Sequence, residues 1–388
     1  MSPTLSPSPF GTAKTLVLKV GSAVLTNADG DLDKGMLRTI ADWTSERMAA
    51  GCNVILVTSG AVAAGRSALG VRDRNLTISQ KQALAAVGQS RLMQIYAELF
   101  ATHGFHVGQM LLTAGDMEDR RRYVNARYTL EELLRRRCIP IINENDTVTV
   151  DELKFGDNDG LAARVAVKMQ ADALVLLSDV DGVFSANPKT TPDARLIEVI
   201  EKVTPALIEQ LCPTSQTGSL VGSGGMLSKL RAARLATSAG THVAIANGKR
   251  PGILSNLVAG KFVGTYFPPA PTHRSQRTQW ILHGRVSGTR QVVVDDGARD
   301  ALLHRHKSLL PAGILRVVGT FKAGDLVDIV DSAGRLLGRG IVNYSSAEMD
   351  LIRGHRSADI AKILGAKPYD EAIHRDNLAL FEEVTSAR

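Results

Sequence analysis

Short apolar runs alternate with longer amphipathic stretches from residue 15 to about residue 250. Several of the runs are apolar at consecutive positions, which is typical of strands that are covered on both faces. The runs that predict strands are residues 15–20, 53–59, 107–112, 139–142, 173–178 and 242–246. Helical stretches, such as residues 80–100 and 126–137, lie between them. This order predicts an α/β fold with an open, mostly parallel sheet sandwiched by helices.

The pattern changes after a proline-rich, polar segment. Residues 266–279 include FPPAPTHRSQR, which predicts a linker. Beyond it, short segments separated by turns predict a small β-rich domain with a few helices. The predicted strands there are residues 291–295, 314–319, 325–330 and 335–342, and a predicted helix covers 297–304. We therefore expect two domains, 13–265 and 280–375, with a disordered tail at 1–12 and a second tail at 376–388.

Composition and charge are those of an ordinary soluble globular protein. Hydrophobic residues make up 44% of the chain and charged residues 22%, and the net charge of +7 is diffuse. Such a charge favours acidic ligands, including nucleotide phosphates. The three cysteines, Cys52, Cys138 and Cys212, are far apart, so we expect no disulfide framework and a reducing cytoplasm. No apolar run approaches the length of a membrane span, and the N-terminus lacks the pattern of a signal peptide.

Small, polar or glycine-rich turns follow five of the predicted strands. In open α/β sheets, ligands bind outside the carboxyl ends of the strands, so these turns should line one edge and share one site. The turns are Gly21-Ser22 and residues 58–61, 143–146, 179–182 and 247–249. The segment from 143 to 159 is dense in charge, with six carboxylates and three asparagines. One of its polar clusters ends a strand and the other begins an alanine-rich helix, where such folds gather ligands.

Two lysines stand beside glycine-rich turns. Lys19 lies near the end of the first strand, where an unpaired buried ammonium is costly, and it would face a phosphate across Gly21. An edge lysine that reaches water is the alternative. Lys229 ends the segment GSLVGSGGMLSK at 218–229. This glycine-rich loop leads into a helix and would offer free backbone N–H groups to an anion. The alternative for that loop is a mobile surface segment, since its spacing fits neither a Walker A loop nor GxGxxG.

Lysines, glycine-rich turns and a carboxylate cluster together suggest phosphoryl transfer. Lysines neutralise charge on the moving phosphoryl group, while a carboxylate-bound magnesium ion bridges the nucleotide phosphates. The sequence contains neither an HExxH zinc motif nor a GxSxG nucleophile elbow.

Seven blocks of the sequence resemble the glutamate 5-kinases of the amino-acid kinase family, in the family's order. The region after the linker resembles a PUA domain, in SLLPAGI at 308–314 and GDLVDI at 324–329. The blocks are KVGSAVLT at 19–26, TSGAVAAGR at 58–66, ALAAVGQ at 83–89, INENDTV at 142–148, FGDNDGLAARVA at 155–166, LLSDVDGVF at 176–184 and GSGGMLSK at 222–229. Asn187 departs from the family pattern, where aspartate is frequent, and we assign it no role.

The resemblance implies ATP-dependent phosphorylation of the side-chain carboxylate of L-glutamate, the first step toward proline, with ATP and Mg²⁺ as cofactors. It implies that Lys19 and Lys229 flank the transferring phosphoryl group and that Asp159 holds both lysines. Ser59, Asp146 and Asn158 would bind glutamate. The residues implied to bind ATP, besides the two lysines, are Ser178, Asp179, Ser223, Gly224, Gly225, Met226, Leu227 and Ser228. No residue is predicted as a direct metal ligand.

The resemblance also implies partners and leaves alternatives. It suggests a homo-oligomer (tetramer or dimer), feedback inhibition by proline, and contact with glutamyl phosphate reductase. The acceptor could instead be another small carboxylate, aspartate or acetylglutamate. From a different class, the PUA-like domain could bind RNA. The C-terminal region lacks an obvious aromatic platform or basic stripe, so we favour a role in assembly or regulation.

Overall fold

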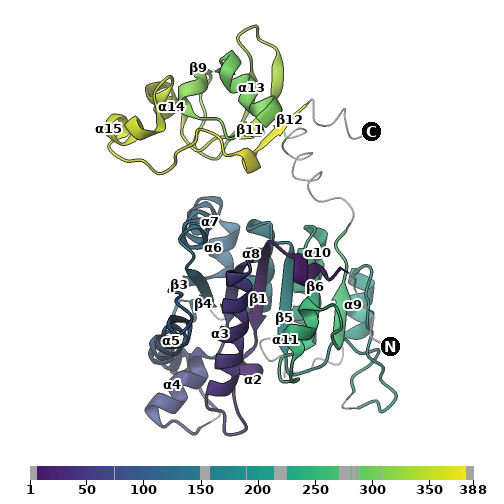
Figure 1. Cartoon of the computed structure of the whole chain (residues 1–388). Helices are drawn as coiled ribbons and strands as arrows, with labels where there is room; N and C mark the ends of the chain where they lie inside the picture. Colours follow the sequence, from purple (N-terminus) through teal and green to yellow (C-terminus); the bar gives the residue numbers. More distant parts are fainter. Residues whose placement is uncertain are drawn as a thin grey trace. The chain divides into compact units, whose positions relative to one another are not determined.

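The computed structural model describes residues 7–73, 75–148, 158–188, 190–213, 225–270, 281, 286, 289–305 and 307–381. The chain divides into two compact units, Met1–Pro271 and Thr272–Arg388 (Figure 1). The buried hydrophobic residues form separate clusters in the two units. Each unit therefore has a core of its own.

A seven-stranded sheet forms the centre of the first unit, in the order β3-β4-β2-β1-β5-β6-β7. Neighbouring strands are parallel, except that β7 runs antiparallel to β6. The strands are β1 (Thr15–Val20), β2 (Asn53–Thr58), β3 (Val107–Leu112), β4 (Ile139–Glu144), β5 (Ala173–Ser178), β6 (His242–Asn247) and β7 (Gly264–Phe267). The mostly parallel α/β sheet predicted from the sequence is confirmed. The parallel pairing also brings the carboxyl ends of β1 to β6 to one edge.

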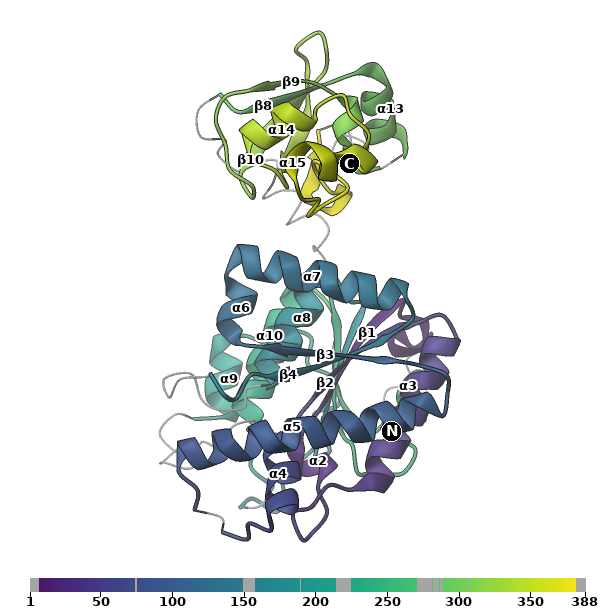
Figure 2. The same ribbon diagram turned by 90° about the vertical axis from the view of Figure 1, so that its left-hand side faces the viewer.

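Helices cover both faces of this sheet, as Figure 2 shows for the layers containing α5 and α7. The helices are α1 (Pro9–Thr12), α2 (Ser22–Leu25), α3 (Lys34–Ala49), α4 (Ala61–Leu69), α5 (Ile78–Ala101), α6 (Ala114–Glu118), α7 (Arg120–Arg135), α8 (Asn158–Lys168), α9 (Pro205–Leu211), α10 (Met226–Ser238) and α11 (Ile253–Val258). None of the helices within the described residues combines the length and the apolarity of a membrane span.

The alternation of side chains along each strand divides the core into two layers. In β1, Leu16, Leu18 and Val20 pack into the layer of α3 and α5. Val17 packs into the opposite layer, with α7, α8 and α10. Because successive strand residues face opposite sides of a sheet, Lys19 faces the same side as Val17. The first strand therefore directs its lysine toward α8 and α10.

Helices α4 and α5 pack unusually closely because two glycines lie at their crossing. A Cβ at Gly65 would overlap the carbonyl oxygen of Leu84, and one at Gly88 would overlap that of Ala61. Gly60, which precedes α4, has a φ of 101°, a left-handed conformation that favours glycine. The turn after β2 is therefore held tightly against α5.

The second unit is a five-stranded sheet with short helices, in the strand order β12-β11-β10-β8-β9. Its strands are β8 (Gln291–Val294), β9 (Ile314–Val318), β10 (Leu326–Val330), β11 (Leu336–Ile341) and β12 (Leu378–Leu380). Its helices are α13 (Asp296–Arg305), α14 (Ser346–Ile352) and α15 (Ile360–Leu364). The small β-rich domain predicted after the linker is confirmed.

The structure differs from the sequence prediction at three boundaries. The range 1–12, predicted as a tail, contains α1, whose buried Phe10 packs edge-on against Phe262 at 5.8 Å. The range 266–279, predicted as a linker, begins inside β7. The range 376–388, predicted as a tail, contains β12, which pairs with β11. In each case the apolar segment is too short to show a periodicity, and it is held by partners distant in sequence.

Candidate active site

The carboxyl end of β1 places Lys19 between two parallel neighbours. Its register partners are Val57 in β2 and Leu176 in β5. The lysine is only 4% exposed. Gly21, two residues later, donates its N–H to the Leu177 carbonyl at 3.1 Å, and a Cβ on this glycine would lie 3.5 Å from the Lys19 ammonium. The glycine turn therefore leaves open the space beside the ammonium.

A single carboxylate joins Lys19 to Lys229. Asp159, in the first turn of α8, is 0% exposed, and Lys229, in the first turns of α10, is 4% exposed. The Lys19 ammonium lies 2.7 Å from Asp159 Oδ1, and the Lys229 ammonium lies 3.0 Å from Asp159 Oδ2. The Ser228 hydroxyl also donates to Oδ2, at 2.7 Å. Three segments far apart in the sequence thus meet in one buried ionic cluster.

This Lys19–Asp159–Lys229 cluster joins one buried carboxylate to two lysines. Burial acts to raise the pKa of the Asp159 carboxyl, but the charges of Lys19 and Lys229, with hydrogen bonds from Lys19 and Ser228, hold that pKa below its usual value. The carboxylate therefore stays ionised between the two ammonium groups. The N-terminus of α10 adds backbone N–H groups and the positive end of a helix dipole. Such a cluster is suited to an anion.

Polar side chains beside the cluster form a connected amide network. Asn158, at the start of α8, donates from Nδ2 to Ser59 Oγ and to Asn143 Oδ1, both at 3.1 Å. The backbone N–H of Glu144 donates to Asn143 Oδ1 at 2.9 Å and to Asn158 Oδ1 at 3.1 Å. Since Ser59 Oγ accepts a hydrogen bond here, its own hydroxyl hydrogen is left to donate in another direction.

Asp146 follows the end of β4 by two residues and carries an unusual carboxyl. Its Oδ1 is buried and has no hydrogen-bond partner among the described residues. Burial raises the pKa of Asp146 from 3.8 to about 6. A buried carboxylate without a partner is stabilised when a cation binds beside it.

The residues predicted to bind ATP divide between two segments. Ser178 ends β5 and donates its hydroxyl to Asp179 at 3.2 Å. Gly225 caps α10, and Met226, Leu227, Ser228 and Lys229 form its first turns. Ser223 and Gly224 lie outside the described residues, as do residues 149–157 of the acid-rich segment. The contacts of Asp159 with Ser228 and Lys229 bring the start of α10 to the carboxyl edge of the sheet.

The turns after β5 and β6 are joined by a second ionic contact. Asp181 accepts from Arg250 at 2.8 and 2.7 Å and from Asn247 at 3.0 Å. Hydrogen bonds from Arg250, together with that from Asn247, lower the pKa of Asp181 despite its partial burial. Gly248 also donates its N–H to the Ser178 carbonyl at 2.8 Å. These bonds fix the turns on the β5–β6 side of the edge.

Two residues of the amide network have no role predicted from the sequence. Asn143 was placed only within a polar turn, and Gln89 only within the block ALAAVGQ. In the structure, Asn143 Nδ2 donates to Gln89 Oε1 at 2.8 Å. Gln89 lies on α5, more than 50 residues before Asn143, and no sequence pattern specifies that contact.

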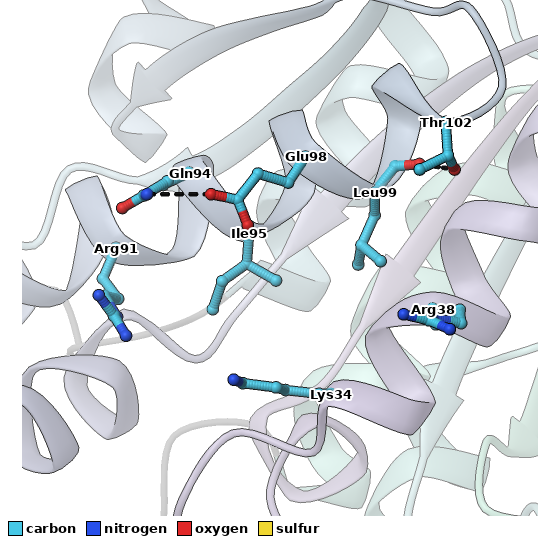
Figure 3. Close-up of a pocket in the computed structure, with 8 residues that line it drawn as sticks. All are labelled: Lys34, Arg38, Arg91, Gln94, Ile95, Glu98, Leu99 and Thr102. Atoms are coloured by element: carbon cyan, nitrogen blue, oxygen red, sulfur yellow. Dashed lines mark hydrogen bonds between the residues drawn. The ribbon is translucent and has the colours of Figure 1, made fainter.

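A groove of about 400 Å³ between α3 and α5 is lined by other residues. Figure 3 shows Ile95 and Leu99 pointing from α5 toward α3, with Lys34, Arg38 and Arg91 around them. None of the residues that line it belongs to the ionic cluster or to the amide network. The groove is therefore a separate feature of this unit.

The described residues provide no cage for a metal ion. Among them, no group of three or more histidine, cysteine, aspartate or glutamate side chains is placed to hold one. Asp159 has both carboxylate oxygens engaged by lysine.

The fold and the site define the class of protein. Residues 14–247 match the amino acid kinase family, and residues 290–364 match the PUA domain. The chain belongs to the amino acid kinase family.

Several relatives of known name match almost the whole chain. A glutamate 5-kinase of Geobacter sulfurreducens is 48% identical over 368 residues, which cover 95% of this chain and 97% of the relative. Glutamate 5-kinases of Myxococcus xanthus and Methylobacillus flagellatus are 46% and 47% identical, over 95% of this chain and 96% and 98% of their own lengths. A solved isopentenyl phosphate kinase aligns with 65% of this chain and 99% of its own, at 20% identity and a TM-score of 0.44.

Proposed function

We propose that this chain transfers the γ-phosphoryl group of ATP to the side-chain carboxylate of L-glutamate, giving L-glutamyl 5-phosphate for proline biosynthesis. Relatives named glutamate 5-kinase, at 46–48% identity over 95% of the chain, support the substrate. The observation that carries the chemistry is the buried Lys19–Asp159–Lys229 cluster at the carboxyl edge of the sheet.

The chemistry needs no general base from the protein. The acceptor carboxylate of glutamate has an ordinary pKa of about 4.3 and is ionised at neutral pH. Catalysis can then depend on aligning the two substrates and on stabilising charge that spreads over the transferred phosphoryl oxygens. Lys19 and Lys229 supply that charge, and Asp159 holds their ammonium groups in place. Fixed by a buried carboxylate, both cations are positioned before the reaction begins.

Ser59, Asn158 and Asp146 are the residues that we assign to glutamate. The hydroxyl hydrogen of Ser59, which has no acceptor among the described residues, suits a carboxylate of the substrate, and the amide network fixes Asn158 beside it. The buried oxygen of Asp146 suits the α-ammonium group, which would compensate its charge. These assignments give the two ends of the amino acid different partners.

We assign ATP binding to Ser178, Asp179 and the segment Ser223–Lys229. The structure describes this segment from Gly225 onward. The capping end of α10 offers N–H groups to phosphate oxygens. Magnesium, when bound with ATP, would neutralise part of the charge on the phosphates. Lys19 and Lys229 would supply the remaining positive charge from the protein.

The test is a coupled hydroxamate assay with ATP, magnesium and L-glutamate. Hydroxylamine traps the acyl phosphate, so hydroxamate and ADP should form in equal amounts. Aspartate and N-acetylglutamate, assayed in parallel, should give little of either product. If one of them were preferred, the substrate would be wrong; if no acceptor gave ADP, the kinase activity itself would be disproved.

Finer features of the same enzyme are also proposed, and family resemblance supports them. We expect inhibition by proline, a homo-oligomer (dimer or tetramer), a cytoplasmic location and contact with glutamyl phosphate reductase. An acyl phosphate hydrolyses readily, which favours direct transfer to the enzyme that consumes it. Adding proline to the hydroxamate assay tests the first feature, and light scattering tests the oligomeric state.

An RNA-binding function receives little support from the second unit. Four of its arginines are neutralised by carboxylates, at distances from 2.7 to 3.1 Å: Arg290 by Asp325, Arg299 by Asp296, Arg335 by Asp331 and Arg339 by Asp328. RNA binding depends strongly on unpaired cations that face the phosphate backbone. We therefore favour a role in assembly or regulation for this unit.

A further inference from the structure

Gln89 is a buried amide in the middle of α5, where an apolar residue would be expected. Its side chain is 8% exposed, and its neighbours Leu92 and Tyr96 on the helix belong to the hydrophobic core. Its Oε1 accepts from Asn143 Nδ2 at 2.8 Å, whereas its Nε2 is buried without a hydrogen-bond partner among the described residues. Leaving a donor unsatisfied costs stability, so the residue is not explained by packing.

The backbone of β4 fixes the orientation of every amide in this network. The Glu144 N–H can only donate, and it points at both Asn143 Oδ1 and Asn158 Oδ1. The two asparagines must therefore present their oxygens to this N–H, and their Nδ2 groups must face elsewhere. The Nδ2 of Asn143 faces α5, where only an acceptor can satisfy it. Gln89 Oε1 is that acceptor.

The same orientation extends to Ser59. Asn158 Nδ2 donates both to Asn143 Oδ1 and to Ser59 Oγ. A series of hydrogen bonds thus runs from Gln89 through Asn143 and Asn158 to the serine hydroxyl, whose hydrogen remains to be donated to a ligand. Gln89 itself lies at the far end of the series from Ser59.

The packing of α5 fixes the position of Gln89. Gly88, the preceding residue, allows α5 to approach the carbonyl of Ala61, the first residue of α4 after the turn that follows β2. Ser59 lies at the start of that turn. The helix and the turn are therefore held together on one side, while the amide network joins them to β4 on the other.

We propose that Gln89 is a positioning residue for the acceptor substrate: by accepting from Asn143, it holds Asn158 and Ser59 in the orientation that binds the acceptor carboxylate. The inference rests on the proposed function. The series of hydrogen bonds ends at the residues assigned to glutamate, and none of its members is assigned to ATP. Gln89 is thus expected to act on the binding of one substrate only.

The test measures KM for glutamate and for ATP in the full-length protein with Gln89→Met. Methionine has a similar length but cannot satisfy the Asn143 amide, so that donor is left buried and unpaired. We expect KM for glutamate to rise at least about tenfold, equivalent to about 1.4 kcal/mol, and KM for ATP to stay within about twofold. If the methionine variant fails to fold, Gln89→Leu removes the same hydrogen-bond acceptor with a side chain of another shape.

Two controls separate positioning from a general loss of structure. Leu92→Ala, three residues further along α5, removes buried packing without touching the network, and it should lower the melting temperature while leaving both KM values unchanged. In an Asn143→Ala background, Gln89→Met should raise KM for glutamate little further, because its partner is already absent.

The possible results distinguish this inference from the proposed function. If wild type phosphorylates glutamate and Gln89→Met changes neither KM, or both equally, the positioning role is disproved. The positioning role is also disproved if the double variant raises KM for glutamate by the product of the two single effects of Gln89→Met and Asn143→Ala. If wild type prefers aspartate or N-acetylglutamate, the substrate assignment is wrong. KM for the preferred acceptor is then compared with KM for ATP in the same variants. Without turnover of any acceptor, both proposals are overturned.

Discussion

At the scale of single residues, the proposed site centres on one buried carboxylate that contacts two lysines. One carboxylate, Asp159, is shared by two ammonium groups, and its lowered pKa keeps it ionised. Removing a single cation should affect the transition state more than the folded structure, because the remaining Lys19–Asp159 pair is still balanced.

Lys229→Ala tests this directly. We expect kcat to fall by about a hundredfold to a thousandfold, the usual effect of losing one electrostatic donor to the transition state. Circular dichroism should show an unchanged fold. Lys168→Ala, at the other end of α8, removes a lysine that lies 4.0 Å from the Tyr123 ring and should leave kcat near wild type. Near-normal turnover of the Lys229 variant would exclude it from catalysis.

Asp146 predicts a pH dependence. Only its ionised form can bind the ammonium of glutamate, so kcat/KM for glutamate should fall as pH decreases through about 6, the pKa of the free enzyme. Asp146→Asn should have a low kcat/KM throughout and lose this acid limb. A wild-type profile that is flat between pH 5 and 7 would contradict the assignment.

The same pKa has a consequence for stability of the ligand-free protein. Its folded value, about 6, lies above the ordinary value of 3.8, so the folded state holds an extra proton between these pH values. Stability should therefore fall as pH rises through this window. Asp146→Asn should remove this decrease in stability with rising pH. Its melting temperature at pH 7 should therefore exceed that of wild type, although the variant impairs glutamate binding.

At the scale of elements, the crossing of α4 and α5 determines how the turn after β2 meets the amide network. Gly88→Ala would place a methyl group against the Ala61 carbonyl. We expect the helices to separate, with a loss of stability at the upper end of the usual range of about 1–3 kcal/mol for overpacking. Urea denaturation measures this loss.

A matched substitution in another helix provides the control. Gly35 lies in α3, and a Cβ there would meet only the Asp33 carboxylate, at 3.3 Å. Gly35→Ala should be neutral or stabilising, because alanine has the higher helix propensity. Equal effects of the two substitutions would show that the crossing is not the tightly packed contact described here.

The comparison of sequence and structure also belongs at this scale. Consecutive apolar residues predicted the parallel strands correctly, because strands buried on both faces have that pattern. The contact between Asp159 and Lys229, which are 70 residues apart, followed only from family resemblance, because separation along the sequence does not determine distance in space. Gln89 could not be predicted, because a polar residue in an amphipathic helix is ordinarily solvated. The strand β7 was missed because four residues before a proline pair show no periodicity.

At the scale of the whole molecule, the two units have separate cores. The clusters around the seven-stranded sheet extend from Phe10 to Phe267, and those of the second unit begin at Ile281. Every residue assigned to catalysis or to substrate binding lies in the first unit. We therefore expect that neither the chemistry nor the folding of that unit requires the second sheet.

A chain that ends at Pro271 tests this independence. It keeps Tyr266 and Phe267 of β7, whose pairing with β6 closes the sheet, and Ala270, whose N–H donates to the Thr237 carbonyl at 3.0 Å. We expect it to fold and to keep kcat and both KM values within about threefold of the full chain, a difference of less than about 1 kcal/mol.

A chain that ends at residue 265 is the matched control. It lacks the last two residues of β7, including the fully buried Phe267, and it should unfold at a lower temperature. If the chain ending at Pro271 folded but lost activity, the second unit would contribute to catalysis, and the assignment of the site to one unit would be wrong. Altered proline inhibition or oligomeric state with unchanged turnover would instead place the role of the PUA domain in regulation or assembly.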